Sequence, residues 1–372
     1  MSFLKEMISW DLVQLAAHEI DYQSLVGRSN QRGLDKVQNV MSIEMLGSND
    51  SGLFPTLCAT RDFQATDPRD KVFAVLGLTQ EASSSLAPDY NLSVSEVYRQ
   101  AVRFLVQSIQ DLTVLGDIDH SATEQSSAKS NNFSSWTPRY DKPRTCSILV
   151  RAYPPFQAAG QRIDMETIPS DSHSLALGGL RIDTLAVLGP VMTSDMIANG
   201  SGLCQIWNQC LNFVTSYPTG EHVLRAFSLT MAADKTLKGE SAATDPNHDE
   251  DFAAYITETG HELKHLSSRE HDALVLRAIT GNALRYEGAV AMISTGRRFF
   301  TTGEGFMGLC PSGAKENDLV CVFFGGPLLY IIRPEENLFR FVGACYVHGR
   351  MDGSAVEEQI RHFAPMEMFS LH

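Results

Sequence analysis

The segment ATDPRDKVFAVLGL, residues 65–78, joins a polar start to an apolar run. Asp67 followed by Pro68 is typical of a helix start, because aspartate accepts hydrogen bonds from unpaired backbone N–H groups and proline has none to leave unpaired. The residues from Val72 onward supply a buried side, and Gly77 can take the left-handed conformation that ends a helix. The sequence therefore predicts a capped core helix over residues 67–77.

Helical spacing of apolar residues recurs on both sides of this segment. It predicts helices within residues 1–26, 93–109, 191–232 and 253–291. Ser93 and Glu96 form a capping-box pattern at the start of the second of these.

Short apolar runs separated by Gly, Pro and Asn dominate the last part of the chain. They predict strands at residues 299–302, 306–309, 319–324, 328–332 and 339–348. We therefore expect an α+β fold, in which a mostly helical N-terminal two-thirds packs on a small C-terminal antiparallel sheet or partial barrel.

The expected organisation has two parts within one compact unit. Residues 1–296 form a mainly helical region, with a short strand pair near 174–191 and an exposed insertion near 233–251. Residues 297–372 form the antiparallel β region and the C-terminal tail.

Composition excludes several classes of function. The net charge of −14 disfavours binding to the phosphates of nucleic acids. The apolar runs are too short for a membrane-spanning helix, and the N-terminus lacks a signal-peptide pattern. The seven cysteines are scattered and odd in number. Free thiols in the cytoplasm are the expected state.

Several segments resemble sequence blocks of the fungal heterokaryon-incompatibility (HET) family. They are residues 65–78, 88–90, 94–98, 134–138, 297–300, 308–311, 318–322 and 346–353. The blocks that characterise the HET domain proper do not occur in the chain. The resemblance therefore implies the C-terminal region of such a protein, lacking the HET domain itself, and it does not imply a chemistry.

A metalloprotease-like pattern, His261-Glu262-Leu263-Lys264-His265, is the sharpest chemical motif. On a helix the two histidines would share a face and could hold zinc, with Glu262 as the general base. His271 stands where a third ligand would fall, but Ser268 replaces the glycine that the chain reversal needs. A zinc metalloprotease is therefore a remote alternative, and we expect no metal. Nucleotide-binding glycine motifs are also missing, so no cofactor is expected.

Polar residues in the strand-rich region give the candidate site. We predict His348 and Tyr346 as catalytic residues and Trp136, Arg298 and Asp352 as substrate-binding residues, all lining a cleft between helices and sheet. The structural alternative is that Asp352 caps a turn and His348 is a hydrogen-bonded, half-buried histidine.

The absence of cofactor motifs leaves reactions that need only a shaped pocket. The main hypothesis is a cofactor-independent enzyme of fungal secondary metabolism on a HET-like scaffold. It would be a cyclase or isomerase that templates a cyclisation or rearrangement of a hydrophobic small molecule, such as an intramolecular Diels–Alder reaction. The alternative is a heterokaryon-incompatibility (non-self recognition) protein or a binding module without catalysis. The sequence leaves open whether the chain is an enzyme and what its oligomeric state is.

Overall fold

The computed structural model describes residues 52–79, 85–110, 112–120, 133–146, 149, 156–160, 173–210 and 216–372. The helix expected within residues 1–26 lies outside the described residues. The chain divides into two compact units. One contains residues 1–104 and 140–143, and the other contains residues 105–139 and 144–372.

In the first unit, the described helices are α3 (Leu53–Thr60), α4 (Asp70–Leu76) and the first part of α6 (Val94–Ile109). The α4 helix begins later than predicted. The Asp67 carboxylate accepts a hydrogen bond from the Arg69 N–H at 2.9 Å, which makes a turn before the helix instead of a cap on it. Gly77 keeps a right-handed conformation, with φ −69°, so the predicted left-handed end is also wrong. The Ser93 cap of α6 is confirmed, because its Oγ accepts the Glu96 N–H at 3.2 Å.

Arg69 and Tyr90 hold two resemblance blocks of this unit together. The Arg69 guanidinium donates to the Tyr90 carbonyl and, at 3.1 Å, to the Leu92 carbonyl. The Tyr90 hydroxyl donates to Asp70 at 2.6 Å, and the Tyr90 ring packs edge-on against Phe73. The polar residues of the 65–78 segment therefore have a structural role.

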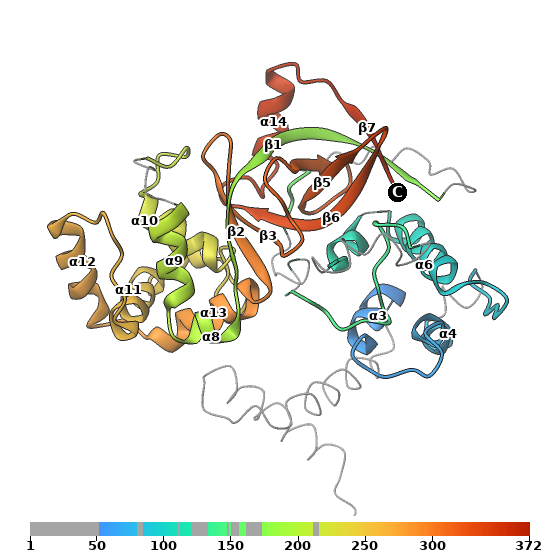
Figure 1. The fold of residues 1–372 in the computed structure, drawn as a ribbon, viewed down its shortest axis with the longest axis horizontal. Helices are drawn as coiled ribbons and strands as arrows, with labels where there is room; N and C mark the ends of the chain where they lie inside the picture. Colours follow the sequence, from blue (N-terminus) through green and yellow to red (C-terminus); the bar gives the residue numbers. More distant parts are fainter. Residues whose placement is uncertain are drawn as a thin grey trace, which may run out of the picture. The chain divides into compact units, whose positions relative to one another are not determined.

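In the second unit, seven strands form one sheet that closes on itself (Figure 1). They are β1 (Leu175–Val191), β2 (Arg297–Thr302), β3 (Met307–Pro311), β4 (Leu319–Phe323), β5 (Leu329–Glu335), β6 (Leu338–Val347) and β7 (Glu367–Leu371). Their order is β2-β3-β6-β5-β4-β1-β7. Because β1 also pairs with β2, six of these strands form a closed barrel.

The β1 strand ties the barrel together. Its first residues pair with β7, its middle with β4 and its last with β2, and the register shifts between Arg181 and Asp183. A Cβ on Gly179 would lie 2.2 Å from the Val322 carbonyl oxygen, so only glycine permits this approach. The expected short strand pair near 174–191 is therefore corrected to one continuous strand, because the glycines lie within the strand instead of forming a turn.

The helices between β1 and β2 in the chain group beside the barrel (Figure 1). They are α8 (Ser194–Ala198), α9 (Ser201–Cys210), α10 (Val223–Met231), the 3-10 turn η3 (Ala242–Thr244), α11 (His248–Thr259), α12 (Ser268–Ala278) and α13 (Ala283–Ser294). Phe227 of α10 links them to the barrel, since its ring contacts Trp207 at 5.3 Å and Phe299 of β2 at 5.9 Å between centroids.

The segment 233–251 differs from the exposed insertion expected there. Ala233, Lys235, Ala242 and His248 are buried within it. Asp234 accounts for the compact course of the chain, because its carboxylate accepts hydrogen bonds from the Ser241 hydroxyl and the Ala243 N–H and so closes a loop.

The coarse fold class is confirmed as helices together with a C-terminal sheet. The expected antiparallel character holds for each strand pair except β6 with β7, which is parallel. The mostly helical N-terminal part is confirmed only in part, since β1 and the 3-10 turn η1 (Thr113–Asp117) lie within it. The helix α14 (Ser354–Arg361) joins β6 to β7. Within the described residues, no helix combines the length and the apolar character needed to cross a bilayer.

Candidate functional site

Tyr346 and His348 lie at the end of β6 and are joined by a hydrogen bond. The Tyr346 hydroxyl is 2.9 Å from His348 Nδ1, and both residues are buried. Burial raises the pKa of Tyr346, so its hydroxyl stays protonated and can donate to Nδ1. The structure therefore brings together the two residues predicted as catalytic, but in a buried position.

Glu221 completes this arrangement from the segment before α10. Its carboxylate lies 2.7 Å from His348 Nε2, and the hydrogen bond from His348 holds the pKa of Glu221 below its ordinary value. Because Glu221 is ionised, His348 Nε2 carries a proton and donates it to that carboxylate, while Nδ1 shares the other hydrogen bond with the Tyr346 hydroxyl. The Tyr217 hydroxyl also donates to the His348 carbonyl at 2.8 Å, so both the ring and the backbone of His348 are held.

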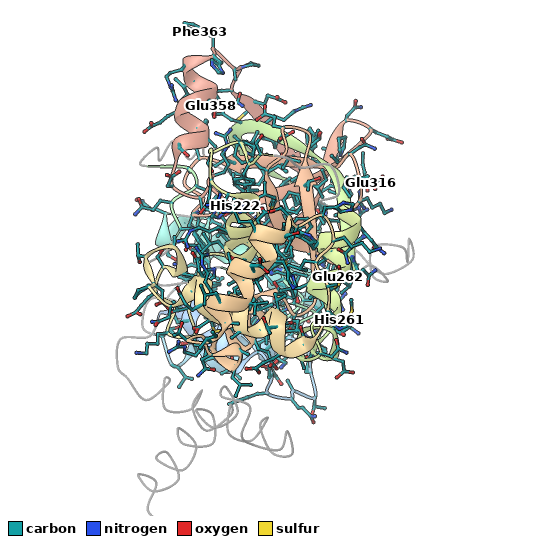
Figure 2. The ribbon with its side chains drawn as sticks, turned by 90° about the vertical axis from the view of Figure 1, so that its left-hand side faces the viewer. His222, His261, Glu262, Glu316, Glu358 and Phe363 are labelled. Atoms are coloured by element: carbon teal, nitrogen blue, oxygen red, sulfur yellow. The ribbon has the colours of Figure 1, made fainter. Side chains whose placement is uncertain are left out.

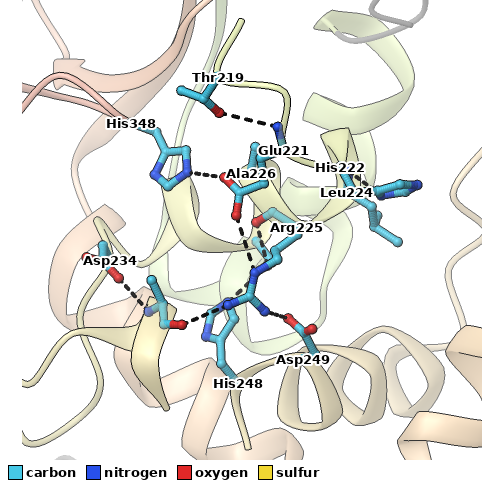
Figure 3. Close-up of polar contacts among 12 residues, drawn as sticks. Thr219, Glu221, His222, Leu224, Arg225, Ala226, Asp234, His248, Asp249 and His348 are labelled. Carbon is cyan, nitrogen blue, oxygen red and sulfur yellow. Dashed lines mark hydrogen bonds and ion pairs between the residues drawn. The ribbon is translucent and has the colours of Figure 1, made fainter. Parts of the chain in front are cut away.

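A chain of charged side chains leads from Glu221 across the helices (Figure 3). Arg225 Nε lies 3.3 Å from Glu221, one helical turn earlier. The other guanidinium nitrogens of Arg225 bind Asp249 and the Ala243 carbonyl. Asp249 also faces Arg277 of α12 at 3.4 Å. These alternating negative and positive side chains hold Arg225 in one position on α10.

A cavity of about 320 Å³ lies among α10, α11 and α12, where Arg225, Asp249 and Arg277 form part of its lining. Its lining is His222, Leu224, Arg225, Ser228, Asp249, Phe252, Ala253, Glu270, Ala273, Leu274 and Arg277. Most of the exposed lining surface is apolar, although six of these eleven residues are polar or charged, and the charged groups are already paired with one another. His222, for example, lies 3.1 Å from Glu270. Such a site suits an apolar group surrounded by polar contacts.

Trp136, Arg298 and Asp352, predicted as substrate-binding, have separate structural partners. The Trp136 indole donates to the His173 carbonyl at 3.3 Å, and its side chain is fully buried. Arg298 donates to the Gly189 carbonyl at 2.8 Å. Asp352 accepts the Ser354 N–H at 3.0 Å and closes the turn before α14. None of the five predicted site residues lines the cavity described above.

The His261–His265 motif lies in a connection, not on a helix. The α11 helix ends at Thr259, Gly260 takes the left-handed conformation, and Ser267 caps α12. His265 itself has a positive φ of 66°. Backbone groups of the motif bind α9, since the Lys264 carbonyl accepts from the Trp207 indole at 2.8 Å. Figure 2 shows His261 and Glu262 in this connection. Among the residues that the structure describes, no cluster of His, Cys, Asp or Glu is arranged to hold a metal ion.

Three residues of this arrangement were not predicted from the sequence: Glu221, Arg225 and Asp249. The i,i+4 spacing of Glu221 and Arg225 is a signal that sequence could have provided. The pairing of Glu221 with His348 is not, because 127 positions separate them.

Residues 233–364 match the family model of the Het-6 beta-barrel domain. This range contains β2 to β6 and α11 to α14, whereas β1, which closes the barrel, precedes it. A curated relative, heterokaryon incompatibility protein 6, OR allele, of Neurospora crassa, is 24% identical over 344 residues. That alignment covers 78% of this chain and 49% of the relative, so the chain spans about half the relative's length. No solved structure matches.

These similarities confirm the resemblance to the heterokaryon-incompatibility family. They also overturn the main functional hypothesis. A family model and a relative that both carry the name of an incompatibility protein favour the alternative, and nothing supports a cyclase of secondary metabolism. Missing cofactor motifs, on which the cyclase hypothesis depends, are equally expected of a binding module.

Proposed function

We propose that this chain is a recognition component of heterokaryon incompatibility, which binds a partner protein and does not transform a substrate. The observation that carries the proposal is the Het-6 beta-barrel match over residues 233–364. The similarity to heterokaryon incompatibility protein 6 over 78% of the chain supports it. A hydrophobic small-molecule substrate is expected only for a cyclase. In this proposal the partner is a protein. A nucleic-acid partner is not expected for a chain of net charge −14.

The contact surface in this proposal is the cavity among α10, α11 and α12. Its floor includes the apolar residues Phe252 and Leu274, and Arg277 stands at its edge with a side chain that is 57% exposed. An apolar floor with a polar rim is the usual composition of a protein-binding hot spot.

Tyr346 and His348 have a positioning role in this proposal. They hold Glu221, and Glu221 in turn holds Arg225 at the cavity. Trp136, Arg298 and Asp352 support the barrel framework through the backbone contacts described above. The cytoplasm remains the expected location, and free cysteines such as Cys310 and Cys345 suit a reducing compartment. The division of the chain into one region of residues 1–296 and another of residues 297–372 remains a prediction.

The test is vegetative fusion between strains that differ only at this locus. We expect fused cells that combine different alleles to lose viability, whereas fusions between identical strains survive. Loss of viability should require the protein, so deletion in both partners should abolish it. Equal viability in every combination, with the protein confirmed by immunoblot, would contradict the proposal.

A further inference from the structure

The segment before α10 runs over the surface at the end of β6. We call this segment, residues 216–221, the strap. Tyr217 is buried, at 2% exposed, and the side chain of Glu221 is 25% exposed. The other residues of the strap are exposed. Tyr217 and Glu221 are therefore the side chains that hold the strap on the barrel.

The Tyr217 hydroxyl occupies a position in the β3–β6 ladder. The register of these strands, with Gly308 opposite Val347, places Met307 opposite His348. In an antiparallel ladder such a pair exchanges two N–H···O=C bonds. One of them is present, from the His348 N–H to the Met307 carbonyl at 2.9 Å. In place of the other, the Met307 N–H donates to the Tyr217 hydroxyl at 3.2 Å, and the hydroxyl donates to the His348 carbonyl at 2.8 Å.

The same two backbone groups can be satisfied without Tyr217. The existing bond from the His348 N–H already holds the strands at ladder distance, so withdrawal of the hydroxyl lets the Met307 N–H reach the His348 carbonyl directly. A buried N–H that loses its partner is costly, but here the ladder supplies a replacement. The docked and the withdrawn strap are therefore two discrete ways to satisfy one pair of backbone groups, as a two-state element requires.

The rest of the strap is held by contacts near the surface. The Glu221 carboxylate lies 2.7 Å from His348 Nε2. A Cβ on Gly349 would lie 2.8 Å from the Thr219 side chain, so glycine leaves room for the strap at the turn after β6. Figure 3 shows Thr219, Glu221 and His348 in this arrangement. A surface segment with few buried side chains belongs to the part of a fold that opens at low free energy.

Withdrawal of the strap changes both the barrel end and α10. The Tyr217 ring lies against Phe306 and His348, with centroids 5.9 and 5.5 Å away, so its departure uncovers one side of the His348 ring. Glu221 leaves with it, and Arg225 then loses the ion-pair partner that lies 3.3 Å from its Nε. The two regions therefore respond to one movement.

We propose that residues 216–221 open and close as a unit over His348, and that the Tyr217 hydroxyl and a direct Met307–His348 bond close the β3–β6 ladder in turn. The closed strap covers His348 and holds Arg225. The open strap exposes His348 to solvent and releases Arg225 from Glu221. This device belongs to the chain by itself and does not rest on the partner binding proposed above.

The experiment is hydrogen–deuterium exchange of the full chain, with overlapping peptides that resolve the amides of Gly220 and Met307. In wild type, the Gly220 N–H, which donates to the Tyr217 carbonyl, should exchange faster than the amides of β4. Tyr217→Phe keeps the ring and removes the hydroxyl. It should speed Gly220 exchange by more than about tenfold, because the closed state loses two hydrogen bonds. The Met307 amide should stay as slow as those of β4, because the His348 carbonyl accepts its N–H directly.

A second variant loosens the strap from its other end. Glu221→Gln weakens the contact with His348 and leaves the Tyr217 hydroxyl in place. Gly220 should again exchange faster, and Met307 should again stay slow. Glu357→Gln, at an exposed glutamate of α14, is the matched control and should leave both rates unchanged. If Tyr217→Phe does not fold, Glu221→Gln provides the same test.

Three results would overturn the inference. The first is a wild-type Gly220 amide as slow as those of β4, because the strap then does not open by itself. The second is a Gly220 rate that neither variant changes. The third is a Met307 amide that becomes as fast as Gly220 in Tyr217→Phe, because no direct bond then replaces the hydroxyl. The fusion assay can succeed or fail independently of these rates.

Discussion

The helical unit around Arg69 and the barrel unit around His348 use polar side chains in different ways. Arg69 binds a carbonyl only 23 residues away in sequence, and its side chain is 24% exposed. His348 binds a carboxylate 127 residues away, and its side chain is 10% exposed. The first unit joins neighbouring segments near the surface, and the second joins distant segments in the interior.

This difference explains the role that each block of family resemblance has in the structure. Residues 65–78 and 88–90 occur together because Arg69, Asp70 and Tyr90 bind one another's segments. The shared contacts give these two blocks a structural role. The block at residues 346–353 instead supplies Tyr346 and His348 to a buried network that reaches α10.

The largest effect is expected in the barrel core. Phe299→Ala should lower the free energy of unfolding of the barrel unit by about 4 kcal/mol, because it leaves a cavity beside Phe227. Chemical denaturation followed by circular dichroism measures the loss. Leu276→Ala, at a side chain that is 69% exposed, should change it by less than about 0.5 kcal/mol. Similar values for both would remove the distinction between core and surface.

A matched pair of aspartates tests the contrast in ion pairs. Asp318 is 3% exposed and binds Arg333 through both carboxylate oxygens, at 2.7 and 2.8 Å. Asp318→Ala should lower the free energy of unfolding by about 3 kcal/mol, because Arg333 loses its buried partner. Asp67→Ala should change the stability of the first unit little, because its pair with Arg69 is solvent-screened. Equal decreases in the thermal midpoint of unfolding for the two variants would contradict this contrast between a buried and an exposed ion pair.

The buried network predicts a dependence on pH. The pKa of Glu221 is below its ordinary value, mainly because His348 donates to it, so folding favours its ionised form. The stabilisation is present above the ordinary glutamate pKa of 4.5 and is lost as pH falls through the lower folded value. Glu221→Gln should cost about 1 kcal/mol at neutral pH, after allowance for partial exposure.

Stability of this variant is compared with wild type by denaturation at a series of pH values. The difference should shrink toward zero in acid. Glu287 serves as a control of opposite sign, because burial raises its pKa. Its contribution should be lost as pH rises instead. A Glu221→Gln difference that is constant with pH would show that the His348 contact is not electrostatic.

Local pattern was sufficient to predict much of the secondary structure. The strands β2 to β6 were predicted because each is an apolar run bounded by turn residues, and α6 because Ser93 caps it. The capping box of Ser267 and Glu270 is also visible in the sequence and would have placed a helix start after the His261–His265 motif. A helix that starts there leaves the His261–His265 motif outside it, whereas the zinc hypothesis needs both histidines on one helix face.

Other features depend on distant contacts and could not be predicted. The strand pair expected near 174–191 is one strand, because the close approach of β4 requires Gly179 inside it. The Glu221–His348 pair joins the segment before α10 to the end of β6, which are far apart in the sequence. The cavity likewise needs three helices to be placed in space before it exists.

The most direct measurement of the central claim is viability after vegetative fusion with the cavity blocked. Strains would carry wild type, Ala273→Phe or the neighbouring control Asp272→Phe, with equal protein levels verified by immunoblot. If the chain acts by recognition through the α10–α12 cavity, Ala273→Phe should restore viability to unlike fusions, and Asp272→Phe should not. If Ala273→Phe kills fused cells as efficiently as wild type, the cavity is not the recognition surface and the account is contradicted.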